Sequence, residues 1–336
     1  MTLVSLLSRW RSNPEVAANI IDWRTLPARA ARVEPFPVEL NPALTGALQQ
    51  QGIQNLYIHQ VAAWRLAGQG VNFVVQTGTA SGKTLCYNLP ILDRLLEEED
   101  ACALYLFPTK ALAQDQLAKL NSTLESIQGG NTTKPILAAI YDGDTPTASR
   151  ASIRSRVRLL LSNPDMLHTG ILPHHASWMR FWRGLRYVVI DEMHTYRGVF
   201  GSHVANVIRR MKRVARFYGS SPQFILSTAT IGNPTELAER LVEEPVQLID
   251  EDGSAKGVKH FLIYNPPLID QALGLRRSVL QETVNLAEDL LSHHVQTVIF
   301  GRSRRSVEIL LTYLRECLPT NHHNSPENPD DNEAVR

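Results

Sequence analysis

The sequence predicts an α/β protein built around a buried parallel β-sheet. Two observations predict this fold: short apolar runs alternate with longer helical patterns, and the chemically distinctive residues come directly after the runs. A third observation concerns the loop after the run at residues 71–75, which reads Thr77-Gly78-Thr79-Ala80-Ser81-Gly82-Lys83-Thr84. A strand, a small-residue loop and a helix start in this order are typical of a phosphate-binding site.

The elements are expected in four segments. Residues 1–50 carry helical patterns interrupted by prolines, which predicts a helical N-terminal extension. Residues 51–250 should form the sheet domain, with strands at 73–75, 102–107, 136–140, 157–161, 187–190 and 224–226. An acidic, turn-rich stretch at 250–254 marks the boundary to a second α/β domain, which is expected over 251–318. This domain should contain a helix at 279–293, a strand at 295–300 and a helix at 303–317. Residues 319–336 are too polar to fold alone, which predicts a disordered tail.

Length and composition suggest a cytoplasmic protein of about two domains. The 336 residues include 34 basic and 33 acidic side chains, so any nucleic-acid surface must be local. Cys86, Cys102 and Cys317 have no metal-site spacing and fit a reducing compartment. The N-terminus lacks the features of a signal peptide, and no apolar run reaches membrane-spanning length.

The phosphate-binding loop predicts binding of a nucleoside triphosphate with Mg²⁺. Backbone N–H groups of small residues can turn toward phosphate oxygens, Lys83 can reach the β- and γ-phosphates, and the Thr84 hydroxyl can hold the metal. The sequence departs from the strict pattern at one point, because its first glycine position is Thr77 and Gly78 follows one place later.

Acidic residues follow the predicted strand at 187–190. Asp191 is assigned to Mg²⁺, Glu192 to the attacking water, and His194 completes the polar group. The alternative is an ordinary helix N-terminus, where acidic side chains complement the helix dipole.

Three further loops follow predicted strands. The hydroxyls of Ser227, Thr228 and Thr230 suggest a relay between a nucleotide and a second ligand, although helix capping is the ordinary role of such residues. The other two loops suggest contacts to a phosphate backbone, and their candidate residues are Pro108, Thr109, Lys110, Ser162 and Asn163.

Together these motifs resemble the superfamily-two helicases of the DEAD/DEAH-box group. Residues 76–84, 108–116, 191–194 and 227–230 are similar to motifs I, Ia, II and III, and residues 56–60 resemble the Q-motif, in which Tyr57 and Gln60 would contact adenine. Residues 79–90, 194–204 and 262–267 resemble the YprA/Hrq-type branch. The resemblance implies a RecA-like lobe that uses ATP and Mg²⁺, and a repair-related helicase that moves 3′ to 5′ on single-stranded DNA.

Residues 298–305 resemble motif IV, which implies the beginning of a second RecA-like lobe and a strand contact for Arg302. Motifs V and VI find no match, so we expect a truncated chain. The alternative is an ATP- and DNA-binding fragment that does not unwind. An RNA helicase is the alternative within the enzyme class, although residues 191–194 read Asp-Glu-Met-His and not Asp-Glu-Ala-Asp. Five basic residues at 209–216 could add a nucleic-acid surface or an ordinary solvated helix face.

Overall fold

A computed structural model of the chain describes residues 3–128 and 135–317. The chain divides into two units, which we call the large unit (residues 29–256) and the small unit (residues 1–28 and 257–336). This division differs from the expected boundaries at residues 50 and 250, because the N-terminal segment folds together with the residues after 256. The expected tail at 319–336 lies outside the described residues.

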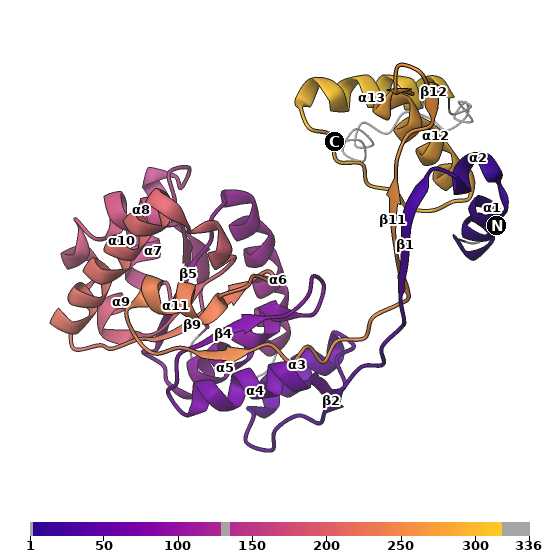
Figure 1. The fold of residues 1–336 in the computed structure, drawn as a ribbon. Helices are drawn as coiled ribbons and strands as arrows, with labels where there is room; N and C mark the ends of the chain where they lie inside the picture. The colour runs from indigo at the N-terminus through magenta and orange to yellow at the C-terminus, as the bar shows by residue number, and fades with distance from the viewer. Residues whose placement is uncertain (1–2, 129–134, 318–336) are drawn as a thin grey trace, which may run out of the picture. The chain divides into compact units, whose positions relative to one another are not determined.

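The large unit contains a seven-stranded parallel sheet in the order β10-β4-β9-β8-β5-β7-β6 (Figure 1). Its strands are β4 (Phe73–Gln76), β5 (Cys102–Leu106), β6 (Ala138–Ile140), β7 (Leu159–Ser162), β8 (Leu185–Ile190), β9 (Gln223–Thr228) and β10 (Gln247–Ile249). All six predicted strands are therefore confirmed. A separate antiparallel pair joins β2 (Val33–Glu34) to β3 (Leu56–Tyr57).

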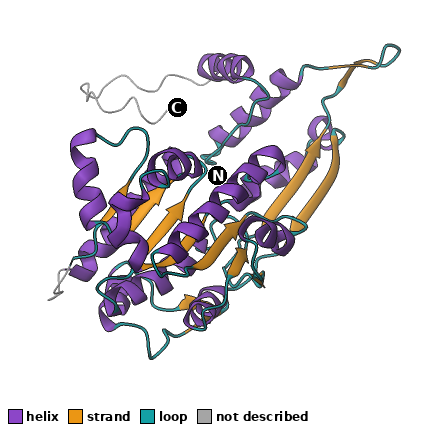
Figure 2. Ribbon diagram, turned by 90° about the vertical axis from the view of Figure 1, so that its left-hand side faces the viewer, coloured by secondary structure: helices purple, strands orange, loops and turns teal. Residues whose placement is uncertain are grey.

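Helices cover both faces of this sheet, as Figure 2 illustrates. One face packs against α3 (Pro42–Gln50), α4 (Ile58–Gly68), α5 (Lys83–Glu97) and α6 (Lys110–Gln128). The other packs against α7 (Thr147–Arg156), α8 (Pro164–Met166), α9 (Met179–Gly184), α10 (Gly198–Phe217) and α11 (Pro234–Val242). Successive strand residues point to opposite faces, so Phe73 and Val75 join one core while Val74 joins the other. A sheet buried on both faces explains why its strands are continuous apolar runs.

The small unit is built from four helices and two antiparallel ribbons in its described part. The helices are α1 (Leu3–Ser12), α2 (Pro14–Ala17), α12 (Val279–Ser292) and α13 (Arg304–Cys317). The ribbons pair β1 (Ile20–Leu26) with β11 (Lys259–Tyr264), and β12 (Leu268–Asp270) with β13 (Leu275–Arg276). Both predicted helices of this region are confirmed. The expected helical N-terminal extension contains α1, α2 and α3, and it also contains the strand β1 at residues 20–26.

The strand expected at 295–300 is wrong. These residues have no regular secondary structure, and Val298 and Phe300 are 73% and 93% exposed. No strand lies beside the segment to complete its backbone hydrogen bonds within the described residues, so an apolar run alone does not become a strand. Among those residues there is also no helix long and apolar enough to cross a membrane.

Candidate functional site

The sheet register brings three of the predicted polar loops together. β4, β9 and β8 are adjacent parallel strands, with Gln76 beside Thr228 and Ile190 beside Leu226. Their carboxyl ends open on the same edge of the sheet, where α/β proteins hold their ligands. The loop at 77–84, the acidic pair at 191–192 and the hydroxyls at 227–230 therefore form one site.

The loop at 77–84 has the backbone of a phosphate cradle. Ala80 and Gly82 have positive φ angles of 56° and 76°, which turn the loop back on itself before α5 begins at Lys83. Glycine suits the positive φ at position 82, and a Cβ atom there would lie 2.6 Å from the Gln60 amide nitrogen, so that side chain would have to move. Thr77 has no positive φ, and its hydroxyl lies 2.6 Å from that of Ser81. This contact explains why threonine is accepted where the strict pattern has glycine.

Lys83 lies against its own loop. Its ammonium donates to the carbonyl oxygens of Thr77, at 3.0 Å, and Gly78, at 3.3 Å. These bonds hold a half-buried cation beside the backbone of the loop. Thr84 is half-buried, and burial raises the pKa of the Tyr87 hydroxyl one turn further along the same helix.

Asp191 follows β8 and is 8% exposed. Burial raises the pKa of its carboxyl, while a hydrogen bond from the Ser227 hydroxyl and the charge of Lys83 act in the opposite direction. The two predicted motifs are thus close enough to interact electrostatically. A cation bound at this carboxylate would oppose the cost of burying its charge.

Glu192 and His194 connect β8 to the loop after β9. Glu192 has a left-handed backbone, with φ of 49°, and its N–H donates to the Ser227 hydroxyl at 3.4 Å. His194 Nδ1 lies 3.2 Å from the Glu192 carboxylate and 3.3 Å from the backbone nitrogen of Ala229. Glu192 and His194, which follow β8, are therefore hydrogen-bonded to Ser227 and Ala229 at the end of β9.

The three hydroxyls at 227–230 have different environments. Ser227 is buried and bonded to Asp191, whereas Thr230 is exposed. Thr228 is fully buried, and its hydroxyl oxygen has no hydrogen-bond partner among the described residues. Among the described residues, Ser227 is the one of these three whose hydroxyl forms hydrogen bonds with Asp191 and Glu192.

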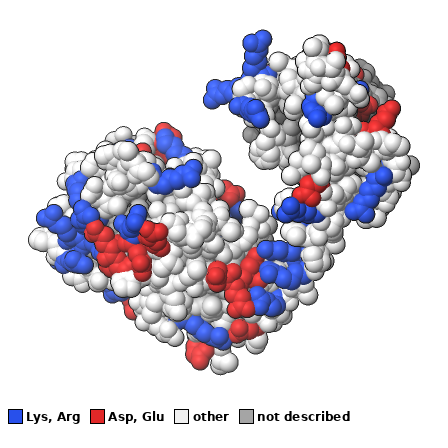
Figure 3. Space-filling view, viewed as in Figure 1, with Lys and Arg blue, Asp and Glu red and all other residues white. Residues whose placement is uncertain are grey.

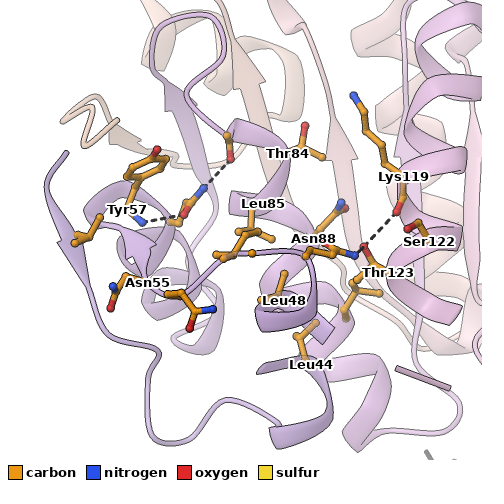
Figure 4. A pocket seen from close by; sticks show the side chains of 18 of the residues that line it. Leu44, Leu48, Asn55, Tyr57, Thr84, Leu85, Asn88, Lys119, Ser122 and Thr123 are labelled. Atoms are coloured by element: carbon orange, nitrogen blue, oxygen red, sulfur yellow. Dashed lines mark hydrogen bonds between the residues drawn. The ribbon is translucent and has the colours of Figure 1, made fainter. Parts of the chain in front are cut away.

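A cavity of about 920 Å³ lies beside the phosphate loop (Figure 4). Tyr57, Gln60, Gly82 and Thr84 line one part of it, and Leu44, Leu48 and Asn88 line another. Both ends of the Gln60 amide are occupied, because its oxygen accepts from Tyr57 N at 2.9 Å and its nitrogen donates to Gly82 O at 3.1 Å. Gln60 thus ties the start of α4 to the phosphate loop.

Two residues that the sequence analysis did not assign also hold this loop. His59 Nε2 lies 2.9 Å from Ser81 O, and Asp252 Oδ2 accepts from Gly78 N at 3.3 Å. His59 lies inside the Q-motif-like segment, where its position beside Gln60 was a signal. Asp252 was interpreted as part of a domain boundary, and no local pattern connects it to a loop 174 residues away.

The predicted nucleic-acid contacts are only partly on the surface. Thr109 and Lys110 are exposed, and Lys110 forms an ion pair with Asp144 at 2.6 Å. Ser162 is 2% exposed and donates to Tyr141 O at 2.6 Å, so its side chain is committed to the fold. Asn163 caps α8 by accepting from Met166 N at 2.8 Å. Pro108 is half-buried, and Arg302 is exposed in the small unit.

The basic residues of α10 are partly neutralised. Arg209 pairs with Glu243, and Lys212 is 9% exposed, with its ammonium on the Val242 carbonyl oxygen and on Glu244. Basic and acidic side chains also adjoin on the face of the large unit seen in Figure 3. The helix is therefore better described as a packed, partly paired face than as a continuous basic surface.

The donor set fits a magnesium nucleotide. Asp191 and Thr84 offer hard oxygen ligands, and Mg²⁺ usually completes its shell with water and substrate phosphates. The described residues contain no cluster of three or more His, Cys, Asp or Glu side chains that could hold a metal by themselves. A metal here would accordingly be held jointly by the protein and its nucleotide.

Comparison with known proteins identifies the family of this chain. The family model of the DEAD/DEAH box helicases matches residues 57–237. The chain is 47% identical over 317 residues to the uncharacterized ATP-dependent helicase YprA of Bacillus subtilis, covering 94% of this chain and 41% of YprA. It is 38% identical to the ATP-dependent helicase HRQ1 of Saccharomyces cerevisiae, covering 94% of this chain and 29% of HRQ1.

A crystal structure of the helicase MrfA bound to DNA matches with a TM-score of 0.90 and 46% identity, over 94% of this chain and 41% of MrfA. Its form bound to DNA and AMPPNP matches with a TM-score of 0.89, over 94% of this chain and 43% of that chain. The chain thus spans less than half the length of these relatives.

Proposed function

The chain belongs to the DEAD/DEAH box helicase family, and we propose that its large unit binds and hydrolyses ATP with Mg²⁺. The observation that supports this most directly is the convergence of Lys83, Asp191 and Ser227 at the ends of adjacent strands. These are the positions at which phosphoryl-transfer sites need a cation, a metal ligand and a connection to a second ligand.

In the proposed reaction Thr84 and Asp191 would hold Mg²⁺, which when bound would supply positive charge to the phosphates. Lys83 would leave the loop carbonyls for the phosphate oxygens. Glu192 orients the attacking water and accepts its proton, and His194 lies beside the Glu192 carboxylate with its Nδ1 accepting from the Ala229 N–H. Ser227 connects Asp191 and Glu192 to the loop at 227–230 and so relays nucleotide state toward nucleic acid.

We infer that the nucleic acid is single-stranded DNA and that the full activity is helicase action, with 3′ to 5′ movement and a role in repair. The DNA-bound MrfA structures and the helicase relatives support this proposal. Thr109, Lys110 and Asn163 follow β5 and β7, which are adjacent strands, and would track the phosphate backbone along one sheet edge. Residues 257–318 would begin the second RecA-like lobe, and the protein would act in the cytoplasm.

An ATPase assay of the 336-residue chain, with and without single-stranded DNA, tests the proposal. We expect Lys83→Ala to reduce turnover by about 100-fold or more, because one preorganised charge contact to the transition state is lost. Glu192→Gln should abolish turnover while leaving nucleotide affinity within about threefold, since the amide keeps the size of the side chain.

Exposed Lys259→Ala and Glu125→Gln serve as matched controls and should leave turnover unchanged. Equal turnover by Lys83→Ala and the wild type would contradict the assignment of the site. Tighter binding of single-stranded RNA than of DNA at equal salt would contradict the choice of DNA.

A further inference from the structure

Residues 252–256, which follow the last strand of the sheet, hold the phosphate loop through one carboxylate. Asp252 Oδ2 accepts from the Gly78 N–H at 3.3 Å and from Lys256 Nζ at 2.7 Å, and Arg29 Nη2 lies 3.6 Å away. Asp252 is 7% exposed. A nearly buried carboxylate with two cationic partners thus touches a backbone N–H of the nucleotide site.

The carboxylate is fixed by the fold around it. Its other oxygen accepts from the Ser254 N–H, at 2.9 Å, and from the Ser254 hydroxyl, at 2.6 Å. Burial alone would raise the pKa of Asp252, but the hydrogen bonds from Lys256, Ser254 and Gly78 outweigh it and hold the pKa below its ordinary value. A group with this many donors is a support for the loop and not a mobile anion that a nucleotide would displace.

The close approach of the segment depends on Gly253. A Cβ atom at position 253 would lie 2.7 Å from Arg32 O and 3.1 Å from Ile58 N, both of them backbone atoms that cannot move aside cheaply. The N–H of Gly253 also donates to His59 Nδ1 at 3.1 Å, and the other nitrogen of that ring lies 2.9 Å from Ser81 O. The segment is therefore joined to the phosphate loop at two points.

Gly78 is held from both sides. Its N–H is bonded to Asp252, and its carbonyl oxygen accepts from Lys83. When Lys83 turns to a phosphate, the carbonyl loses that partner and the bond to Asp252 remains. Gly78 thus links the Lys83 ammonium and the Asp252 carboxylate through its own backbone oxygen and nitrogen.

Arg29 and Lys256, the cationic partners of Asp252, lie at the two points where the chain passes from the large unit to the small unit. Arg29 and Lys256 exchange backbone hydrogen bonds, at 2.8 Å and 2.9 Å. They are the first and last residues of the large unit, and the chain passes from them to Ala28 and to Gly257 in the small unit. The Asp252 carboxylate thus contacts the phosphate loop and the residue at which each connection begins.

We propose that Asp252 is a positioning residue that couples the phosphate loop to the two connections between the units. Occupancy of the nucleotide site then alters the dynamics of residues 28–33 and 254–258, and by linkage a change at the connections alters nucleotide affinity. The proposal rests on the proposed binding of ATP by this loop.

Hydrogen exchange of the 336-residue chain, with and without saturating AMPPNP and Mg²⁺, tests the coupling. In the wild type, AMPPNP should slow exchange in peptides covering 77–84 and, by about fivefold, in peptides covering 28–33 and 254–258. In Asp252→Ala, AMPPNP should bind about tenfold more weakly and, at saturation, should protect 77–84 without protecting the connections.

Asp250→Asn is the matched control, because Asp250 is an exposed carboxylate two residues before Asp252. It should behave as the wild type. If Asp252→Ala does not fold, the double variant Arg29→Gln/Lys256→Gln keeps the carboxylate and its bonds from Ser254 but removes its two cationic partners. It should lose protection at the connections and keep it at 77–84.

Protection of 77–84 without protection of the connections in the wild type would overturn the coupling while leaving nucleotide binding intact. Unchanged coupling in Asp252→Ala or in the double variant would overturn it as well. A wild type without protection at 77–84 would overturn ATP binding itself, and the inference with it.

Discussion

Side chains from several elements hold the phosphate loop in its cradle shape. Gln60 and His59 reach it from α4, Lys83 from the start of α5, and Asp252 from the segment after β10. Each contacts a backbone carbonyl or N–H, so the loop keeps its form without a core of its own. Such preorganisation lowers the cost of ordering the loop when a ligand binds.

His59 makes this arrangement sensitive to acid. It is 1% exposed, and burial lowers its pKa from 6.5 despite opposing contributions from Ser81 and Asp252. Protonation would also place a hydrogen on Nδ1, which accepts from the Gly253 N–H. The folded protein therefore holds the neutral ring, whereas the unfolded chain binds a proton near pH 6.5.

We predict that His59 makes the free energy of unfolding fall as the pH drops below about 6.5, toward its lowered pKa in the folded state. The slope is at most about 1.4 kcal/mol per pH unit, because the unfolded chain binds one more proton in this window. Urea unfolding at pH 7.5 and 5.5 should show a smaller difference for His59→Gln than for the wild type.

The exposed His174 offers a control, and His174→Gln should keep the full pH dependence. An equal pH dependence in His59→Gln and the wild type would mean that the neutral state of this ring does not contribute to stability.

At the scale of elements, α5 connects the nucleotide site to a buried arginine. The helix begins at Lys83 and ends at Glu97, and Arg158 lies at its C-terminal end. Arg158 is 5% exposed and donates to the carbonyl oxygens of Leu95, at 2.6 Å, Glu98, at 2.5 Å, and Ala101, at 3.1 Å. The bond to Leu95 O satisfies a carbonyl of the last turn of the helix, the bonds to Glu98 O and Ala101 O hold the segment that follows it, and the guanidinium places positive charge at the negative end of the helix dipole.

Arg158→Lys should lower the free energy of unfolding by about 2–4 kcal/mol. Lysine has one nitrogen where the guanidinium fork serves three carbonyls, so buried acceptors lose their partners. Chemical denaturation followed by circular dichroism measures the loss. Arg156→Lys, at an exposed position two residues away, should change stability by less than about 0.5 kcal/mol. Similar losses in both variants would argue against the anchoring role.

At the scale of the whole molecule, the sequence predicted what depends on local pattern. Six strands of the large sheet are apolar runs buried on both faces, and each was identified. The seventh, β10, has three residues and an exposed first position, so its run is too short to detect. The pairing of β1 with β11 joins residues more than 230 positions apart, and it depends on long-range contacts that periodicity does not reveal. Residues 295–300 illustrate the converse, an apolar run without a pairing partner.

The site follows the same rule. The phosphate loop, Asp191 and Ser227 come directly after strands, so the fold class predicts their meeting at one sheet edge. The burial of Ser162 could not be predicted, because it depends on the carbonyl of Tyr141, the residue directly after the neighbouring strand β6. Asp252 was missed for a similar reason, since its contact with Gly78 arises from tertiary packing.

The small unit has a compact core of its own. Leu6, Leu7 and Trp10 of α1 are buried together, with Leu262, Leu286 and Leu290 packed against them. The Trp10 indole N–H donates to Asp289 at 2.8 Å, which ties α1 to α12. This core joins the two ends of the described chain but contains no residue of the nucleotide site.

We therefore predict that Leu6→Ala weakens the small unit without impairing nucleotide binding. Leu6 is fully buried, so its truncation should cost about 2–5 kcal/mol of stability in the small unit. Val4→Ala, at a 72% exposed position of the same helix, should cost less than about 0.5 kcal/mol. Thermal unfolding should show an earlier transition in Leu6→Ala, while titration with AMPPNP and Mg²⁺ gives an affinity within about threefold of the wild type. The Arg29–Lys256 bridge belongs to the large unit and should survive this change. A loss of affinity parallel to the loss of stability would instead mean that the two units unfold as one.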